Sequence, residues 1–195
     1  DICTGDDACQ TGACVGVVIP QAPIVEQAGS KYILVTPVPS GPVPPVAIQV
    51  TSPDWPCLNK YVNASGLLVD APVFRTPDDW GTIPVRGMDI APSSQYDARV
   101  LCGGFVSDPG SITTAIFGDL VGDFVNGAWT PPDGDVDILD LTAVADAFRN
   151  KEDRPPLEWT DIAPCTPDRL IDIVDMIWTV DAFKSKPYPC DPPCP

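Results

Sequence analysis

The chain has 195 residues with 27 Asp or Glu against 11 Lys or Arg, a formal net charge of −16, and no histidine. A surface that binds nucleic acid needs clustered basic residues, so this charge balance excludes DNA and RNA as partners. The missing histidine excludes Ser-His-Asp catalysis, histidine-liganded zinc and acid–base chemistry by imidazole.

Eight cysteines in an acidic, proline-rich chain are typical of a disulfide framework formed in an oxidising compartment. A structural zinc site is the alternative, but the sequence contains no C-x-x-C pair. No run of about eighteen apolar residues occurs, so we expect no membrane span. We therefore predict a secreted or cell-surface protein whose disulfides involve Cys3, Cys9, Cys14, Cys57, Cys102, Cys165, Cys190 and Cys194.

Residues 1–21 form a leader with three cysteines and too few apolar residues for a core of its own. Cross-links should therefore hold it in shape. The spacing of its cysteines, C-x5-C-x4-C, resembles the end of a cysteine-rich, growth-factor-like repeat.

Residues 22–117 carry short β-branched runs bounded by Pro, Gly and Ser, which is the pattern of strands in an all-β domain. The 25 prolines of the chain favour such short elements over long helices. We expect an antiparallel β-sandwich with strands within 31–38, 45–52, 66–76, 81–90, 95–102 and 111–117.

The sequences DIAPSSQYDARVLC (89–102) and ITTAIF (112–117) resemble the last three strands of a fibronectin type III-like domain. In such domains a turn precedes a tyrosine that faces inward, here Tyr96. The resemblance implies a fibronectin type III or Ig-like sandwich for this block. We expect its core to include Trp55, Phe74, Trp80 and Tyr96.

The composition changes at residue 118, where we place the start of a third domain, 118–195. Between Asp119 and Asp181, thirteen Asp and two Glu stand against four basic residues. Such a density is typical of a disordered acidic tail or of a cation site. Apolar residues at helical spacing favour the second interpretation. They form two stripes: Ile138, Leu141, Val144, Ala145 and Phe148, and Ile173, Met176, Val180 and Phe183.

The acidic segment contains an internal repeat with an offset of 35 residues. DGDVDILDLTAVADAFR (133–149) aligns with DRLIDIVDMIWTVDAFK (168–184). A unit of one loop and one helix cannot bury its apolar stripe alone, so the two copies should pack together. The identical residues are Asp133, Asp137, Ile138, Asp140, Asp146, Ala147 and Phe148 in the first copy, and Asp168, Asp172, Ile173, Asp175, Asp181, Ala182 and Phe183 in the second.

The acids of the first copy are spaced like those of an EF-hand loop, which offers calcium oxygen ligands from positions 1, 3, 5, 7, 9 and 12. With Asp133 at position 5, Gly134 lies at the sharp turn, and Asp140 falls at position 12, in the first turn of a helix that Leu141 begins. The ligands between them are the carbonyl of Asp135 at position 7 and the side chain of Asp137 at position 9.

The pattern D-G-x-V-D-x-x-D-L of this loop resembles a dockerin type I repeat, a paired loop–helix module of secreted bacterial proteins. The resemblance implies two Ca²⁺ sites in a small helical domain. The first copy departs from it, because its candidates for position 1, Asp119 and Asp123, lie fourteen and ten residues before Asp133 instead of four. In the second copy Arg169 replaces the turn glycine, and the candidate ligands are Asp161, Asp168, Leu170, Asp172 and Asp175.

We expect a non-catalytic, calcium-stabilised extracellular module with a structural or assembly role, because self-repulsion among so many carboxylates would destabilise the fold without a cation. Its partner would be a second copy, head to tail, or another extracellular protein. Catalysis is not expected, since the sequence has no histidine and no Gly-rich loop that binds phosphate. The alternatives are a dockerin that anchors the protein to a cohesin scaffold and a carbohydrate-binding module.

The cysteines suggest how the ends of the chain meet. A disulfide between Cys57 and Cys102 inside the sandwich would leave three cysteines at each end of the chain. One cysteine from each end would then bond across to the other end or to another chain. We therefore expect the leader to pack on the C-terminal repeat region, within a closed monomer or between neighbours in a head-to-tail polymer.

Overall fold

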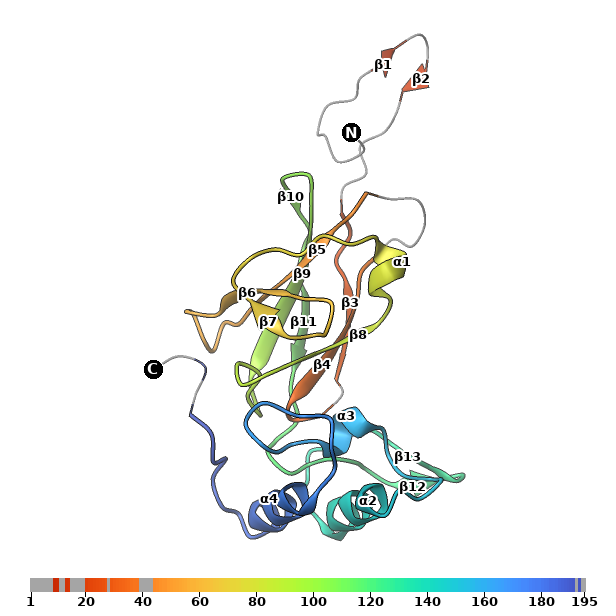
Figure 1. The fold of residues 1–195 in the computed structure, drawn as a ribbon, viewed down its shortest axis with the longest axis vertical. Coiled ribbons are helices and arrows are strands. Elements are labelled where there is room, and N and C mark those ends of the chain that lie inside the picture. Colours follow the sequence, from red (N-terminus) through yellow and green to blue (C-terminus); the bar gives the residue numbers. More distant parts are fainter. Residues whose placement is uncertain are drawn as a thin grey trace.

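Figure 1 shows the chain as a computed structural model that describes residues 20–27, 29–38, 44–191 and 193. It also describes the backbone of two short paired strands, β1 (Cys9–Gln10) and β2 (Ala13–Cys14). Below these strands in Figure 1 lie a β-sandwich and, under it, a small helical unit. The expected docking of the leader lies outside the described residues.

The sandwich consists of two antiparallel sheets. In the smaller sheet, β4 (Tyr32–Thr36) lies between β3 (Ile24–Gln27) and β8 (Ile83–Arg86). The larger sheet has the order β10-β9-β5-β6-β7, and an additional strand, β11, pairs with β9. Its strands are β5 (Ala47–Thr51), β6 (Asn59–Val62), β7 (Leu68–Val69), β9 (Gln95–Cys102), β10 (Phe105–Val106) and β11 (Gly110–Thr113).

Alternation along the strands places the core between the sheets. In β9 every second residue from Tyr96 to Cys102 is buried and the residues between them are partly exposed, as the two-residue period of a strand requires. The core includes Ile33, Val35, Ile48, Val50, Val62, Val85, Ile90, Tyr96 and Val100. The predicted fold class, a mainly β sandwich followed by a small helical domain, is therefore confirmed.

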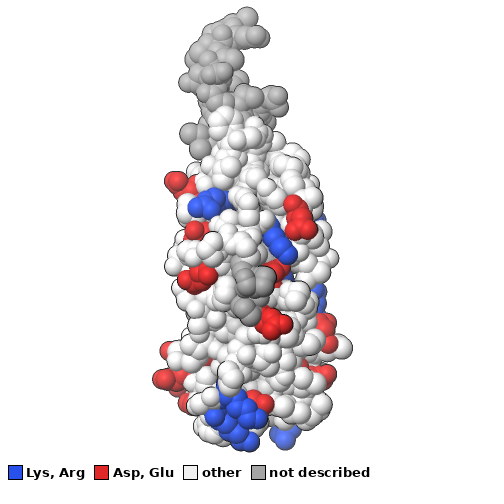
Figure 2. All heavy atoms as spheres, turned by 90° about the vertical axis from the view of Figure 1, so that its left-hand side faces the viewer, with Lys and Arg blue, Asp and Glu red and all other residues white. Residues whose placement is uncertain are grey.

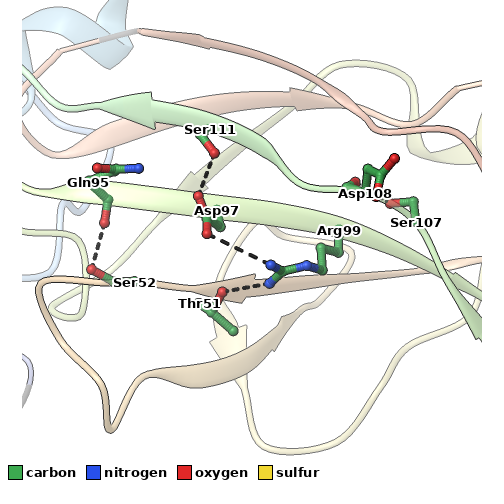
Figure 3. Close-up of polar contacts among 8 residues, drawn as sticks. All are labelled: Thr51, Ser52, Gln95, Asp97, Arg99, Ser107, Asp108 and Ser111. Atoms are coloured by element: carbon green, nitrogen blue, oxygen red, sulfur yellow. Dashed lines mark hydrogen bonds and ion pairs between the residues drawn. The ribbon is translucent and has the colours of Figure 1, made fainter.

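The outer face of the larger sheet is polar (Figure 3). Asp97 lies 3.9 Å from the Arg99 guanidinium and accepts a 2.5 Å hydrogen bond from Ser111 Oγ on β11. Arg99 also donates to Thr51 Oγ1 on β5 at 3.1 Å. The two cross-strand pairs, Asp97–Ser111 and Arg99–Thr51, contribute about 0.2–1 kcal/mol each. This surface therefore shows the ordinary solvent side of a sandwich.

The inward tyrosine predicted by the fibronectin type III resemblance is present. Tyr96 is fully buried, and its hydroxyl accepts from Ala91 N–H at 2.7 Å and donates to the Asp89 carbonyl at 3.1 Å. Trp80, in the short helix α1 (Pro77–Trp80), is also buried, and its indole N–H donates to the Val46 carbonyl. The expectation for Phe74 is wrong, because this side chain is 52% exposed.

The predicted pairing of Cys57 with Cys102 is contradicted by the strand register. Thr51 lies opposite Asp97 and Ala47 opposite Leu101, so Cys57, after β5, and Cys102, at the end of β9, lie at opposite ends of these strands. Five residues of strand span about 16 Å, whereas a disulfide requires Cα atoms within about 7 Å. Both cysteines are disulfide-bonded, and their separation along the strands excludes a bond between them. In the helical unit, Cys165 is bonded to Cys190.

The helical unit contains a hairpin, β12 (Phe124–Val125) and β13 (Ala128–Trp129), and three helices. The helices are α2 (Ile138–Phe148), α3 (Leu157–Thr160) and α4 (Ile173–Phe183). α2 and α4 pack on each other, as expected for two copies of one repeat. None of the described helices is long and apolar enough to cross a membrane.

The core of the helical unit differs from the predicted stripes. Ile138 and Phe148 of α2 and Ile173 and Phe183 of α4 are between 46% and 63% exposed. Val144 of the first stripe is buried as predicted, but the other buried residues of the two helices are small or acidic: Asp140, Ala143, Asp146 and Ala147 in α2, and Asp175, Thr179 and Ala182 in α4. Small side chains allow the helices and loops to approach closely, and the larger core residues come from the loops, including Leu120, Val121 and Ile162.

Candidate functional site

The first loop is organised by the carboxylate of Asp119, which is almost completely buried. Its two oxygens accept hydrogen bonds from the backbone N–H groups of Asp133 (3.2 Å) and Gly134 (2.9 Å). Asp119 thus reaches the residues at loop positions 5 and 6, although fourteen residues separate it from Asp133. The β12–β13 hairpin accommodates the extra residues between them. Asp123, the other candidate for position 1, is exposed beside this hairpin.

Asp140 ties the first loop to the helix that follows it. Its side chain is fully buried, and one oxygen accepts from Leu120 N–H (2.6 Å) and Val121 N–H (3.1 Å). The other oxygen accepts from Asp137 N–H at 2.8 Å. Asp137 is the N-cap of α2, so the two residues form a reciprocal capping box. The helix therefore begins at Ile138, three residues earlier than predicted.

The second loop repeats this arrangement. Asp175 is fully buried, and its oxygens accept from the N–H groups of Ile162, Ala163 and Asp172, each at 2.9 Å. Asp172 is the N-cap of α4 and completes a second capping box. Asp161 is fully buried at the position of Asp119 and accepts from Arg169 N–H at 2.6 Å.

Arg169 occupies the turn that Gly134 makes in the first loop. Gly134 has φ = +101° and Arg169 has φ = +69°, so both residues lie in the left-handed region. A side chain at such a φ costs roughly 1 kcal/mol. The second loop thus keeps a left-handed turn without a glycine, and the Arg169 amide donates to Asp161 as the Gly134 amide donates to Asp119.

The other predicted ligands lie on the exposed side of the loops. Asp133 accepts from Asp135 N–H and Asp168 from Leu170 N–H, which rigidifies both turns. Within the described residues, no three acidic or cysteine side chains converge closely enough to hold a metal ion by themselves. A calcium ion would therefore need carbonyl oxygens and water among its ligands, as EF-hand loops provide. The remaining predicted ligands, Asp135, Asp137, Leu170 and Asp172, are also exposed.

Burial makes the negative charge of these loops costly. Burial, together with the nearby charge of Asp140, raises the pKa of Asp119 to about 7, although the amide hydrogen bonds from Gly134 and Asp133 lower it. Burial likewise raises the pKa of Asp161 to about 6 and that of Asp175 above its usual value, against the amide hydrogen bonds, which lower it. A bound cation would relieve this penalty, because it favours the ionised carboxylate.

One oxygen in the second loop is available to such a cation. Asp161 Oδ1 is buried and has no hydrogen-bond partner among the described residues. An unpaired buried carboxylate oxygen costs free energy unless a cation or water occupies its lone pairs. The oxygen-rich loops thus fit a hard cation, and Asp161 Oδ1 is the atom that most needs one.

The charged surface reflects the burial of these acids. Figure 2 shows acidic and basic side chains interspersed on one face, with basic residues gathered at the lower end, where the helical unit lies. The acidic third of the sequence therefore does not form a uniformly negative surface on this face. Five of its aspartates lie inside the fold: Asp119, Asp140, Asp146, Asp161 and Asp175.

The sandwich and the helical unit meet at residues that the sequence analysis did not select. Tyr32 of β4 donates from its hydroxyl to Asp161 Oδ2 at 2.8 Å, and both side chains are buried. Gly29 lies so close to α3 that a Cβ atom there would stand 3.2 Å from the Glu158 carbonyl oxygen. Nothing in the sequence identifies these contacts, because 129 residues separate Tyr32 from Asp161.

Lys31 makes a second contact between the two parts. Its fully buried ammonium donates to the Ile90 carbonyl at 2.5 Å and contacts the Tyr188 hydroxyl. Tyr188 packs edge-on against Phe117 and Trp178, so the segment after α4 is anchored under the sandwich. Burial lowers the pKa of Lys31 to about 7, and the negative charge of Asp89 partly opposes this shift.

This buried lysine predicts a pH dependence of stability. Between about pH 7.5 and about pH 9.5 the unfolded chain keeps the lysine proton that the folded chain releases, so the free energy of unfolding should rise with pH. The slope from this group is at most about 1.4 kcal/mol per pH unit. Urea unfolding should show that Lys31→Met removes this slope, whereas Lys60→Met, at a partly exposed ion pair with Asp89, keeps it. An unchanged slope in Lys31→Met would show that this lysine stays charged.

No family model matches the chain, and no curated protein matches it significantly. Similar solved structures include a computationally redesigned β-sandwich protein, with a TM-score of 0.36 and 17% identity over 52% of this chain and 93% of that one. The sensor domain of an anti-sigma factor from Pseudobacteroides cellulosolvens has a TM-score of 0.32 and 13% identity over 51% and 98%. A human fibronectin type III domain has a TM-score of 0.32 and 16% identity over 58% and 80%. These likenesses concern the β-sandwich form and indicate no function.

Proposed function

We propose that the protein is a non-catalytic, calcium-stabilised extracellular module with a structural or assembly role. The proposal rests on one observation: each of the two loops buries two carboxylates. In each copy the acid before the loop accepts from the amide of the turn residue, and the acid in the following helix accepts from the two amides that come after the first acid. Two buried negative charges side by side in each loop call for a compensating cation.

The first ion would be held by Asp119, Asp133, the carbonyl of Asp135, Asp137 and Asp140. The second would be held by Asp161, Asp168, the carbonyl of Leu170, Asp172 and Asp175. A bound calcium ion supplies positive charge and oxygen coordination that fasten each loop to its helix. The residues of the chain supply the framework, because the two capping boxes orient the acids before any ion binds.

An assembly role is supported by apolar side chains that the helical unit leaves exposed. Ile138, Ile173 and Ile177 are 50–63% exposed on α2 and α4, and Leu170 in the second loop is 63% exposed. Exposed aliphatic residues gathered on one small unit are typical of a protein-binding surface. We propose that this surface binds a second copy or another extracellular protein, of which a cohesin is the dockerin-like case.

The number of bound ions tests the calcium proposal. Native mass spectrometry of the full chain with a small excess of Ca²⁺ should show two ions per chain. Asp133→Ala and Asp168→Ala should each retain one ion, because these exposed acids belong to different loops and their loss leaves the buried hydrogen bonds intact. Asp78→Ala, at an exposed acid of α1 in the sandwich, is the matched control and should retain both. A wild-type chain that binds no calcium would refute the proposal.

A further inference from the structure

The two loops differ in how their first acid is held. In the first loop each oxygen of Asp119 accepts from a loop amide, Asp133 N–H on Oδ1 and Gly134 N–H on Oδ2. In the second loop Asp161 Oδ2 accepts both the Arg169 amide and the hydroxyl of Tyr32. The second loop is therefore completed by a side chain of the sandwich.

The Tyr32 hydroxyl also determines which oxygen of Asp161 is left without a hydrogen-bond partner. Both donors lie on Oδ2, and Oδ1 has no partner in the described part of the chain. Burial raises the pKa of the Tyr32 phenol, and the charge of Asp161 and its hydrogen bond raise it further. This hydrogen bond joins the sandwich to the helical unit, so it is lost if the two parts separate.

We propose that Tyr32 is a positioning residue for the second cation site, so that ion binding in this loop and docking of the sandwich on the helical unit stabilise each other. The inference rests on the calcium proposal for the second loop. Residues that hydrogen-bond to metal ligands orient them, and their loss typically weakens metal binding by about 10- to 100-fold. Such coupling is reciprocal. If docking of the sandwich strengthens ion binding by some factor, ion binding strengthens the docking by the same factor.

The burial of the interface makes the coupling specific to this loop. Ser30, Lys31 and Tyr32 are all buried, and Gly29 leaves no room for a side chain against α3. α3 ends at Thr160, so the same short segment that contacts the sandwich continues directly into Asp161. Any displacement of the sandwich would move the first acid of the second loop, whereas Asp119 is held by amides of its own loop.

Calorimetric titration of the full chain with Ca²⁺ tests the inference, in backgrounds that retain one site. In Asp133→Ala, which keeps the second site, Tyr32→Phe should raise the dissociation constant about 10-fold. In Asp168→Ala, which keeps the first site, Tyr32→Phe should change nothing. Tyr96→Phe is the matched control, because it removes a buried hydroxyl that bonds only within the sandwich. It should lower stability and leave both affinities unchanged.

Hydrogen exchange gives an independent test that leaves Tyr32 unchanged. Calcium should slow exchange at Lys31, Tyr32 and Asp161 in wild type and in Asp133→Ala, and should not slow it in Asp168→Ala. Equal affinity of Tyr32→Phe and its parent in the Asp133→Ala background, or exchange at these amides that ignores calcium, would overturn the inference while calcium binding stands. Absence of any calcium heat in wild type would instead overturn the calcium proposal itself.

Discussion

Replacing Asp140 or Asp175 by alanine should unfold the helical unit while the sandwich remains folded. Each side chain is fully buried and accepts three backbone hydrogen bonds, so alanine would leave three amide groups without a partner. A buried donor without a partner costs about 1–3 kcal/mol, and the loss of a buried network typically reaches 3–5 kcal/mol. We expect the free energy of unfolding to fall by this amount, as measured by urea unfolding followed by tryptophan fluorescence.

Asp181→Ala is the matched control for this prediction. Asp181 is an acid of α4 at a partly exposed position, where it forms an ion pair with Lys186 at 2.7 Å. Such a surface pair contributes between about 0 and 1 kcal/mol. If Asp140→Ala and Asp175→Ala cost no more than Asp181→Ala, the buried carboxylates are not the framework of the loops.

The sandwich was largely predictable because its strands carry a simple period. β9 occupies the predicted range 95–102 in full, because its alternation of buried and exposed residues fits a strand and no other element. β6 was missed because only one of its four residues, Val62, is buried. β3 was missed because its four residues begin directly after a proline at position 23, which obscures the strand pattern.

The repeat was visible in the sequence, but the packing of its helices was not. From hydrophobicity we expected the largest residues of the two helices in the core. The structure instead buries mainly alanine, threonine and aspartate, because close packing of α2 and α4 favours small side chains. Asp146, an acid of α2, is buried with its carboxylate 2.7 Å from Lys151 Nζ. Its ion pair could not be inferred from the helical period alone.

The sequence predicted which residues belong to the candidate site but not how they are arranged. The offset of 35 residues identified the acids of both loops, and the structure brings Asp119 to Gly134 and Asp161 to Arg169. The choice between Asp119 and Asp123 required the structure, because only the fold shows that a hairpin separates position 1 from position 5. Tyr32 and Lys31 could not be found from sequence, because their partners lie in another part of the chain.

Removal of calcium is the measurement that tests the central claim most directly. At free calcium 100-fold above the dissociation constant, each ion stabilises the folded state by about 2.7 kcal/mol, so two ions contribute about 5 kcal/mol. For a chain of this length, that corresponds to a fall in melting temperature of about 10 °C or more when a chelator is added. Calorimetric melting, with limited proteolysis to locate the loosened segment, should show this fall and new cleavage after residue 118, and excess calcium should restore both. A melting curve and a cleavage pattern that are identical with calcium and with chelator would contradict the account.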